Sequence, residues 1–337
     1  MYPLKFEPFL RTMVWGGTKI ASYKGIETTD DHIGESWELS GVEEHQTNVS
    51  NGALRGKSIT DLVKTFKGRL VGEHVYTENG DEFPLLIKFI DARDDLSIQV
   101  HPDDAMARRQ HGQRNGKTEM WYVVDAGPGA CLYSGLSETI TPEEYERRVT
   151  DGTITEVLAR HDVHPGDVFF LPAGRIHAIC SGCFIAEIQQ TSDLTYRIFD
   201  YGRLGLDGKP RQLHTELAKE AIDYKVYPDY RVPYTPVKDA EEELVRCKYF
   251  TTSVYDLDKP IHKELTDIDS FLVVMCLSGH GTILDSEPIF DAEGRRGPTK
   301  GHLLGIRQGE TVLIPASSLG VTFSPADGGM KLLTSHL

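Results

Sequence analysis

Short apolar or alternating segments, separated by turn residues, dominate this sequence and most limit the folds that it can adopt. Glycine (32) and proline (17) are frequent, so turns are frequent. Many short strands divided by such turns predict an antiparallel β sandwich or barrel. We therefore expect an all-β dominated fold with a few added helices. The clearest strand candidates are Phe83–Ile90, Met120–Val124, Asp167–Leu171, Phe184–Gln189, Phe271–Leu277 and Thr311–Ile314.

Two segments have helical patterns. Residues Ser58–Phe66 begin with a residue that can cap a helix and carry apolar side chains at helical spacing. A second helix is predicted to start at Thr141, which is followed by Pro142 and two acidic residues. A capping threonine, a proline in the first turn and nearby acidic groups all favour a helix N-terminus.

A weak internal repeat predicts two β units. Gly166-Asp-Val-Phe-Phe-Leu-Pro172 and Gly309-Glu-Thr-Val-Leu-Ile-Pro315 share one pattern, and a length of 337 residues suits two domains. Between them, residues 227–243 contain three prolines and an acidic run, which favours a linker over a surface loop within one large domain. We therefore expect a first domain at 1–235, with N-terminal strands and helical insertions, and a second at 236–337.

Charge and cysteine content narrow the class of protein. The net charge of −15 disfavours binding to nucleic acid or anionic membranes, and no run of eighteen apolar residues predicts a membrane span. The N-terminal residues do not have the pattern of a signal peptide. Five cysteines without framework spacing favour a reducing, cytoplasmic location. Cys180 and Cys183 have the spacing of metal ligands, but without a second pair they are interpreted as ordinary strand thiols.

The most specific motif is Gly166-Asp167-x4-Pro172-x-Gly174-x2-His177. It resembles the motif with which proteins of the cupin superfamily supply their last metal ligand. This resemblance implies that each unit is a jelly-roll barrel and that His177 binds a metal ion. In the second unit, the matching position is Gly320, which has no donor side chain. We therefore expect the second unit to be a degenerate barrel without metal.

Earlier residues can complete the metal site. Gln99 and His101 alternate on one face of a predicted strand, and Glu119 opens the next strand. Together with His177 they offer two nitrogen and two oxygen donors, which suit zinc, with manganese, iron or cobalt as alternatives. The competing interpretation is that Gln99 and His101 only cap a strand near a turn. The His177 motif favours one metal ion per chain.

Five further segments are informative, and they lie at 34–40, 97–103, 117–122, 172–177 and 191–197. They resemble the type I mannose-6-phosphate isomerases in their short bacterial form. The likeness is good over roughly residues 1 to 205 and loose beyond. It implies that Gln99, His101, Glu119 and His177 hold zinc and that Arg197 is an active-site residue. It also implies that the pocket is lined by Lys88, Lys117, Glu187 and Asp193.

This resemblance implies an aldose–ketose isomerase that interconverts mannose 6-phosphate and fructose 6-phosphate through an enediol. Arg197 would stabilise negative charge, and Asp193 would orient Arg197. Glu187 is the first candidate for the base and Lys117 the second. Ser97 is expected to contact the phosphate. Lys88 is expected to bind substrate, although a strand-end lysine with a solvated tip would explain it equally well.

Two other functions compete with the isomerase. One is a non-catalytic sugar-binding or regulatory protein with two cupin barrels that kept the metal. Lys117, Glu187 and Arg197 disfavour it, because they accompany the ligands. The other is a cupin dioxygenase, whose iron normally needs more histidines and open positions. The sequence leaves the substrate epimer, the native metal and the oligomeric state open.

Overall fold

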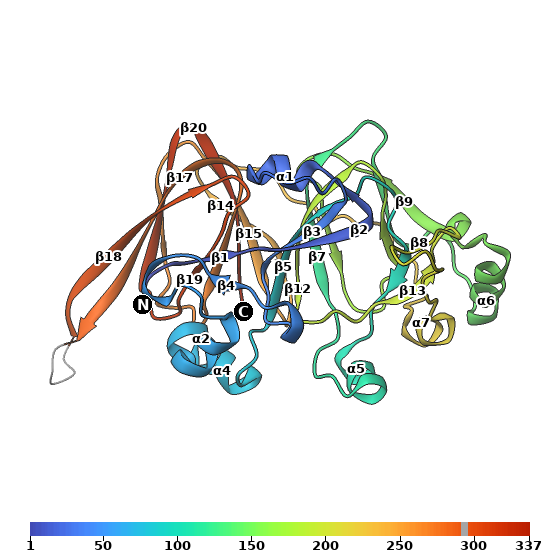
Figure 1. Cartoon of the computed structure of the whole chain (residues 1–337), viewed down its shortest axis with the longest axis horizontal. Helices are drawn as coiled ribbons and strands as arrows, with labels where there is room; N and C mark the ends of the chain where they lie inside the picture. The colour runs from blue at the N-terminus through green and yellow to red at the C-terminus, as the bar shows by residue number, and fades with distance from the viewer. Residues whose placement is uncertain (291–295) are drawn as a thin grey trace. The chain divides into compact units, whose positions relative to one another are not determined.

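The computed structural model describes residues 1–290 and 296–337, and strands predominate among them (Figure 1). The predicted strands and both predicted helices are confirmed, with ends shifted by one or two residues in most cases. No helix in the described ranges is long and apolar enough to cross a membrane. The helices are α1 (Lys19–Lys24), α2 (Ile59–Phe66), α3 (Gly68–Val71), α4 (Glu73–Asn79), α5 (Asp104–His111), α6 (Pro142–Asp151) and α7 (Thr215–Ala221). Single 3₁₀ turns lie at Glu43–His45, Gly52–Leu54 and Ile154–Val157.

The predicted helix caps form. The Ser58 side chain accepts a hydrogen bond from the backbone of Asp61 at the start of α2, and the Thr141 side chain accepts one from Glu144 at the start of α6. Each bond satisfies a backbone N–H that the helix itself cannot pair. The C-terminus of α6 is closed by Gly152 in the left-handed conformation.

The chain forms two compact units, which divide the sequence differently from the expected 1–235 and 236–337. Unit 1 comprises residues 1–9, 38–85 and 233–337, and unit 2 comprises residues 10–37 and 86–232. The boundary near 232 lies close to the expected one. The N-terminal segments depart from expectation because residues 4–7 pair with a C-terminal strand, with Leu4 opposite Leu313. Residues 48–49 pair in turn with residues 4–7, with Val49 opposite Phe6.

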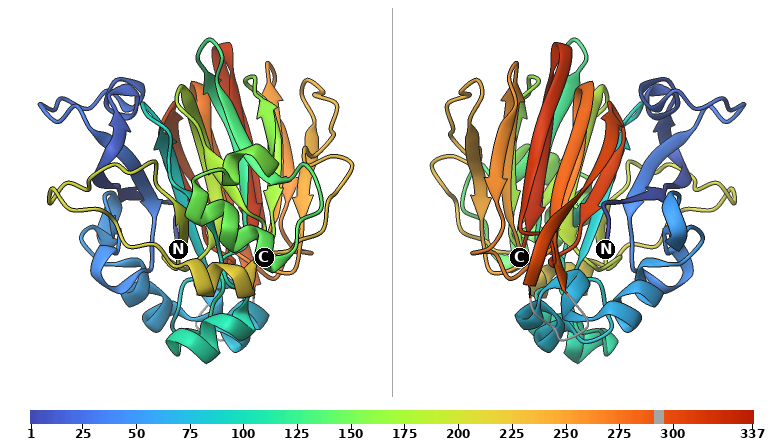
Figure 2. Two further views of the ribbon diagram at one scale, coloured as in Figure 1. Left: turned by 90° about the vertical axis from the view of Figure 1, so that its right-hand side faces the viewer. Right: turned by 90° about the vertical axis from the view of Figure 1, so that its left-hand side faces the viewer.

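Unit 1 contains a nine-stranded sheet within the described residues. Long strands β17 and β20 run side by side in antiparallel register, as the right-hand view of Figure 2 shows. Tyr255, Leu272, Ile314 and Phe323 contribute to the buried core of this unit. The strands are β14 (Glu241–Arg246), β15 (Thr251–Leu257), β20 (Gly320–His336), β17 (Leu272–Phe290), β19 (Thr311–Ile314), β1 (Leu4–Glu7) and β4 (Asn48–Val49), with β16 (Ile261–Glu264) beside β20 and β18 (Arg296–Arg307) beside β17.

Unit 2 contains two antiparallel sheets. One has six strands: β10 (Val168–Leu171), β7 (Glu119–Ala126), β12 (Cys183–Gln190), β5 (Leu85–Asp91), β3 (Ile33–Leu39) and β2 (Phe9–Gly17). The other has five: β13 (Tyr196–Phe199), β6 (Ile98–Val100), β11 (His177–Ile179), β8 (Cys131–Leu136) and β9 (Leu158–Asp162). Both strand orders are open in the described residues, so neither sheet is a closed barrel of the kind expected for the fold.

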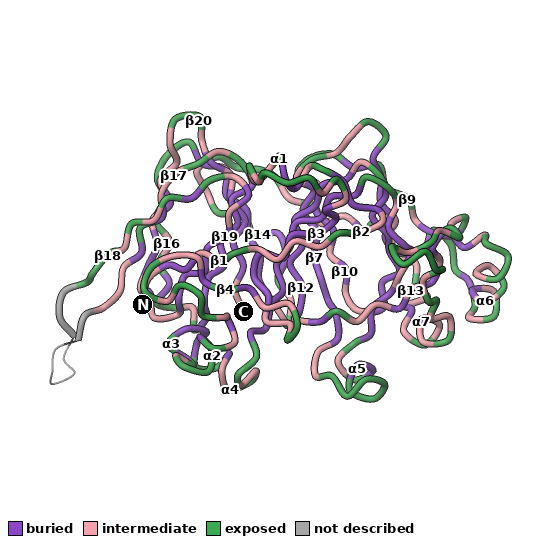
Figure 3. Tube along the Cα trace, viewed as in Figure 1, coloured by how far each residue is buried: buried purple, intermediate pink, exposed green. Residues whose placement is uncertain are grey.

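Two buried clusters hold unit 2 together. The first combines side chains of both sheets, including Ile90, Trp121, Leu132 and Ile185, so it lies between the sheets. The second covers the opposite face of the five-stranded sheet and includes side chains from α6 and α7. Figure 3 shows β5, β7 and β12 buried along most of their length. Burying one large apolar side chain contributes about 1.5–3 kcal/mol. The space between the sheets is also where the polar side chains described below lie.

The internal repeat is visible in the local geometry. The two motifs form the short strands β10 and β19, each preceded by a glycine with positive φ, Gly166 and Gly309. In both, the proline carbonyl accepts a hydrogen bond from the residue three positions later. In unit 2 the next strand begins at His177, and in unit 1 the next strand begins at Gly320. The alignment that pairs His177 with Gly320 is therefore confirmed.

A close backbone approach at Gly72 gives a testable consequence for stability. Gly72 has a φ of +102°, and a Cβ there would lie 2.1 Å from the Asp269 carbonyl oxygen. Gly72→Ala should lower the free energy of unfolding by at least about 3 kcal/mol, because a strained backbone and an unavoidable collision add together. Gly56→Ala is the control, since Gly56 has a φ of +84° but a Cβ there would meet no atom within 4 Å. Gly56→Ala should lower the free energy of unfolding by only about 1–2 kcal/mol. Equal losses in urea unfolding would show that the collision with Asp269 is relieved.

Candidate active site

Three neighbouring strands of the five-stranded sheet bring predicted site residues into one row. Gln99 on β6 lies opposite His177 on β11 and opposite Arg197 on β13. Their neighbours in sequence, such as Ile98 and Ala178, belong to the core on the other face of the sheet. Alternation along each strand therefore turns the polar side chains toward the space between the sheets.

The six-stranded sheet supplies the facing groups. Glu119 on β7 lies opposite Gln189 on β12, and two residues further along each strand Trp121 lies opposite Glu187. Because strand side chains alternate, these four residues share one face of the sheet. The same face of β12 also carries Cys183 and Ile185, which lie in the core between the sheets, whereas Glu187 lines the pocket.

His101, Glu119 and His177 form a buried cluster. His101 Nε2 lies 3.6 Å from Glu119 Oε2, and His177 Nε2 lies 3.4 Å from Glu119 Oε1. The three candidate ligand atoms lie within 4.8 Å of one another. Gln99 Nε2 lies 3.3 Å from His177 Nε2. Rotating the Gln99 amide by half a turn would present its oxygen to the cluster instead. The structure thus brings all four predicted metal ligands together.

Both histidines have the tautomer that metal ligation needs. His101 Nδ1 donates to the Leu194 carbonyl and His177 Nδ1 donates to the Arg175 carbonyl, each at 2.8 Å. A carbonyl only accepts, so Nδ1 carries the hydrogen and Nε2 presents its lone pair. Burial lowers the pKa of His177 to about 3 and lowers that of His101 well below its ordinary value. Both rings are therefore neutral near neutral pH.

The Glu119 carboxylate also fits a cation. It is fully buried, and neither oxygen has a hydrogen bond of regular geometry with the residues that the structure describes. Lys117 Nζ lies 3.1 Å from Glu119 Oε2 and 3.1 Å from His101 Nε2. Burial and the nearby Glu187 raise the pKa of Glu119 to about 7, although Lys117 opposes that rise. A buried carboxylate with two neutral imidazoles is a donor set suited to a divalent metal ion.

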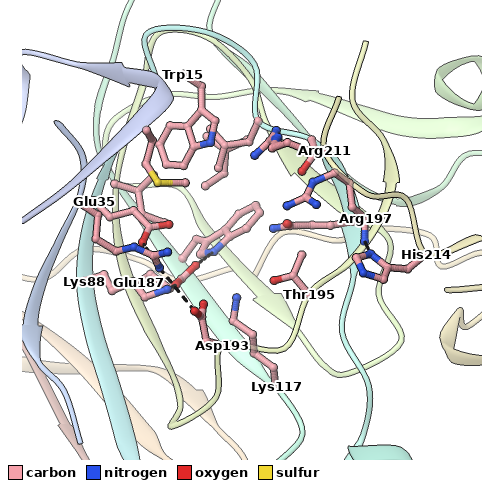
Figure 4. A pocket seen from close by; sticks show the side chains of 18 residues that line it. Trp15, Glu35, Lys88, Lys117, Glu187, Asp193, Thr195, Arg197, Arg211 and His214 are labelled. Carbon is pink, nitrogen blue, oxygen red and sulfur yellow. Dashed lines mark hydrogen bonds and ion pairs between the residues drawn. The ribbon is translucent and has the colours of Figure 1, made fainter. Parts of the chain in front are cut away.

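A polar pocket of about 260 Å³ lies beside this cluster, and Figure 4 shows side chains that line it. In the close-up, Glu35, Lys88 and Glu187 lie on one side, and Arg197, Arg211 and His214 lie on the other. Gln99 and Lys117 line the pocket and also contact the cluster, so the two features are one site. Five further predicted residues line the pocket, namely Lys88, Ser97, Glu187, Asp193 and Arg197.

Glu187 and Lys88 form a buried ion pair in the pocket wall. Lys88 Nζ lies 3.1 Å from Glu187 Oε1, and Trp121 Nε1 donates to Glu187 Oε2 at 2.8 Å. Burial favours the neutral acid, but Lys88 and Lys117 hold the pKa of Glu187 below its ordinary value. Burial also disfavours charge on Lys88, but Glu187 and Glu35 raise its pKa above the ordinary value. Glu187 is therefore a carboxylate, the form that a base requires.

The energetic coupling between Lys88 and Glu187 can be measured by replacing each residue alone and both together. Lys88→Met should lower the free energy of unfolding by about 3–5 kcal/mol, because Glu187 would be left buried without its partner. Lys88→Met combined with Glu187→Gln should recover most of that loss. Urea unfolding of the two single variants and the double variant measures the coupling. Simple addition of the two single losses would contradict a functional pairing of these side chains.

The opposite side of the pocket is rich in arginine. Arg197 Nη1 donates to the Gln212 carbonyl at 2.9 Å, while its buried Nε has no hydrogen-bond partner among the described residues. Arg211 donates from Nε and Nη2 to Asp200, at 2.6 and 2.5 Å. Burial, followed by the neighbouring Arg211, lowers the pKa of Arg197. This side can therefore attract an anionic group.

One predicted contact is wrong. Asp193 was expected to orient Arg197, but Asp193 Oδ2 instead lies 3.6 Å from Arg11 Nη1, and the Gln212 carbonyl holds Arg197. Arg11 also pairs with Glu35 Oε2 at 3.4 Å. The reason is that β2 brings Arg11 to the same side of the pocket as Asp193, which no local pattern in the sequence indicates.

Several pocket residues escaped the sequence analysis, namely Arg11, Glu35, Thr195, Arg211 and His214. Glu35 could have been found, because it lies within the segment 34–40 and alternates with Trp37, whose Nε1 donates to it at 2.6 Å. Thr195 lies within the recognised segment 191–197. Arg211 and His214 lie in an irregular connection after β13, where periodicity carries no signal.

The pocket contains the buried Lys88–Glu187 ion pair and lies beside three residues that can hold a metal ion, His101, Glu119 and His177. Such an arrangement in a β-rich protein is typical of an enzyme active site. The family model for "Phosphomannose isomerase type I, catalytic domain" matches residues 4–134. Mannose-6-phosphate isomerase ManA of Bacillus subtilis is 31% identical over 338 residues, covering 99% of each chain. The chain therefore belongs to the type I mannose-6-phosphate isomerase family and is an isomerase, which confirms the resemblance seen in the sequence.

Two further matches agree with this assignment. The probable mannose-6-phosphate isomerase GmuF of B. subtilis is 35% identical over 285 residues, covering 85% of this chain and 89% of the relative. The crystal structure of the mannose 6-phosphate isomerase from B. subtilis has a TM-score of 0.82 at 27% identity and covers 100% of both chains. Only a loose likeness was expected beyond residue 205, but the matched relatives and structure cover that part of the chain as well.

Proposed function

We propose that this chain interconverts mannose 6-phosphate and fructose 6-phosphate through an enediol. The observation that carries the proposal is that Glu187 lines the same pocket as Gln99 and Lys117, which both contact the His101–Glu119–His177 cluster. Isomerisation moves a proton between two adjacent carbons, so it needs a base beside the carbons and positive charge beside their oxygens. The pocket offers both.

Gln99, His101, Glu119 and His177 would hold one zinc ion. When bound, a divalent cation supplies a Lewis acid that polarises substrate oxygens. Glu187 takes the proton from C2 of the aldose and returns it to C1, while the hydroxyl proton of O2 passes to O1, which yields the ketose. Arg197 stabilises the negative charge of the enediolate, and Trp121 keeps Glu187 in position through its hydrogen bond. Lys117, beside the cluster, is the second candidate for the base.

The remaining predicted residues would bind the substrate. Lys88 and Asp193 line the side of the pocket that holds Glu187, and Ser97 lines the same cavity. The side of the pocket that contains Arg197 and Arg211 is suited to the phosphate. The two arginines carry two positive charges, and the Asp200 carboxylate that binds Arg211 cancels one of them. A dianion can thus be attracted although the whole chain carries a charge of −15.

We also propose that each unit is a jelly roll of the cupin type that does not close fully, and that the protein acts in the cytoplasm without a nucleic-acid partner. The repeated glycine–acid–proline motif supports the first point, since it forms the same local structure in both units. The five cysteines are all free thiols, which supports the second.

The direct test is an assay of purified protein loaded with zinc, with mannose 6-phosphate as substrate and fructose 6-phosphate as the measured product. Activity should disappear after treatment with a chelator and return when zinc is restored. Fructose 6-phosphate should also be converted back. Binding of mannose 6-phosphate without any turnover in the zinc-loaded protein would favour the regulatory alternative and overturn the proposal.

A further inference from the structure

Two cysteines face each other on adjacent strands of the five-stranded sheet. Ile179 on β11 lies opposite Leu132 on β8, so the next pair in this antiparallel register is Cys180 and Cys131. The Cys180 backbone N–H donates to the Cys131 carbonyl at 3.2 Å, which confirms the alignment. Both are free thiols outside the lining of the pocket.

The strand geometry allows these thiols to form a bond. Residues directly opposite in antiparallel strands have Cα atoms about 4.5–5.5 Å apart, within the range of about 4.4–6.8 Å that disulfides require. Their side chains leave the sheet on the same face, because residues directly opposite in an antiparallel pair do so. Cys183 is placed differently, because its side chain is fully buried in the core between the sheets and donates to the Cys131 carbonyl.

The surroundings make Cys131 the more reactive partner. Arg160 on β9 interacts with the Cys131 sulfur, and its own side chain is about half exposed. The hydrogen bond from Cys180, followed by the positive charge of Arg160, lowers the pKa of Cys131 to about 7. The same hydrogen bond and burial raise the pKa of Cys180. Both residues are buried, with 8% of Cys131 and 5% of Cys180 exposed, whereas Cys183 and Cys276 are fully buried.

We propose that Cys131 and Cys180 are a thiol pair that a peroxide converts into an intrachain disulfide. The Cys131 thiolate attacks one peroxide oxygen, the O–O bond breaks, and the products are a sulfenic acid and water once a proton is taken up. The Cys180 sulfur then attacks the Cys131 sulfur and displaces the hydroxyl group, which leaves as water with the Cys180 proton. Overall, two thiols lose two electrons and two protons, and one peroxide is reduced to two waters.

The Cys131–Cys180 pair lies near the candidate active site but is not part of it. Cys180 follows β11 directly, and His177 is the first residue of that strand. A disulfide at Cys180 would tie the end of β11 covalently to β8. This inference does not depend on the proposed substrate, so the oxidation experiment and the isomerase assay can fail separately.

The test uses reduced, full-length wild-type protein treated with a small excess of hydrogen peroxide, then blocked with iodoacetamide and digested with trypsin. Cys131 lies in the tryptic peptide Thr118–Arg147, and Cys180 and Cys183 both lie in Ile176–Arg197. We expect a cross-link between these two peptides that dithiothreitol reverses, with Cys183 carrying the blocking group. Cys131 should be modified at least about tenfold faster than Cys276, a buried thiol of unit 1 in the same sample.

Two variants separate the steps. Cys180→Ala should prevent the cross-link and leave a sulfenic acid on Cys131 that dimedone traps. Cys183→Ala should form the cross-link as the wild type does. A cross-link through Cys183, a bridge between Cys180 and Cys183 within one peptide, or oxidation of Cys131 no faster than Cys276 would overturn the proposal.

Discussion

Replacing His177 with alanine should remove the bound metal and lower turnover by roughly a thousandfold or more. His177 Nε2 faces Glu119 at 3.4 Å and Gln99 at 3.3 Å, so this ring is central to the candidate ligand set. Without it, one nitrogen donor is lost and the remaining carboxylate and imidazole hold an ion less tightly. Metal content by elemental analysis and the rate of fructose 6-phosphate formation should fall together.

His161→Ala is the matched control. His161 lies on β9 of the same sheet, is partly buried, and makes a hydrogen bond with the Ser134 carbonyl, but it does not line the pocket. This variant should keep its metal and most of its activity. A His177→Ala protein with a full metal content would contradict the ligand assignment, and two tightly held ions per wild-type chain would contradict a single site.

Glu187→Gln should lower turnover by about a hundred- to ten-thousandfold while zinc and substrate still bind. Glutamine has nearly the same shape as glutamate, and its oxygen can accept the hydrogen bond that Trp121 donates to Glu187. The amide cannot take a proton from carbon, however. Exchange of the transferred hydrogen with labelled solvent should therefore disappear with turnover, which NMR in deuterated water measures directly.

Lys117→Gln is the comparison that decides between the two candidate bases. Lys117 Nζ lies 3.1 Å from both Glu119 Oε2 and His101 Nε2, so its loss removes a positive charge beside the donor atoms and should not lower the metal content. Glu187→Gln should change turnover at full metal occupancy. If turnover and solvent exchange persist at near wild-type rates in Glu187→Gln, Glu187 only shapes the pocket, and Lys117 becomes the base.

The sequence indicated those parts of the site that local patterns determine. Strand alternation placed Gln99 with His101, and a turn motif placed His177, because both depend on neighbours within about ten residues. Which strands lie side by side depends on long-range pairing that one sequence does not reveal. Arg197 therefore could not be aligned beside Gln99, and Arg11 could not be paired with Asp193, 182 positions away. The division into units was missed for the same reason, since β1 pairs with β19.

The pairing of β1 with β19 also bears on how the chain is made. Leu4 emerges early from the ribosome, but its partner Leu313 is synthesised 309 residues later, after about 15–60 s at ordinary elongation rates. During that delay the edge of β1 has no β19 to cover it, and exposed strand edges promote aggregation. All of unit 2 is complete by residue 232 and can fold first. Premature termination before β19 should therefore leave a formed pocket on a chain that requires chaperones to stay dispersed.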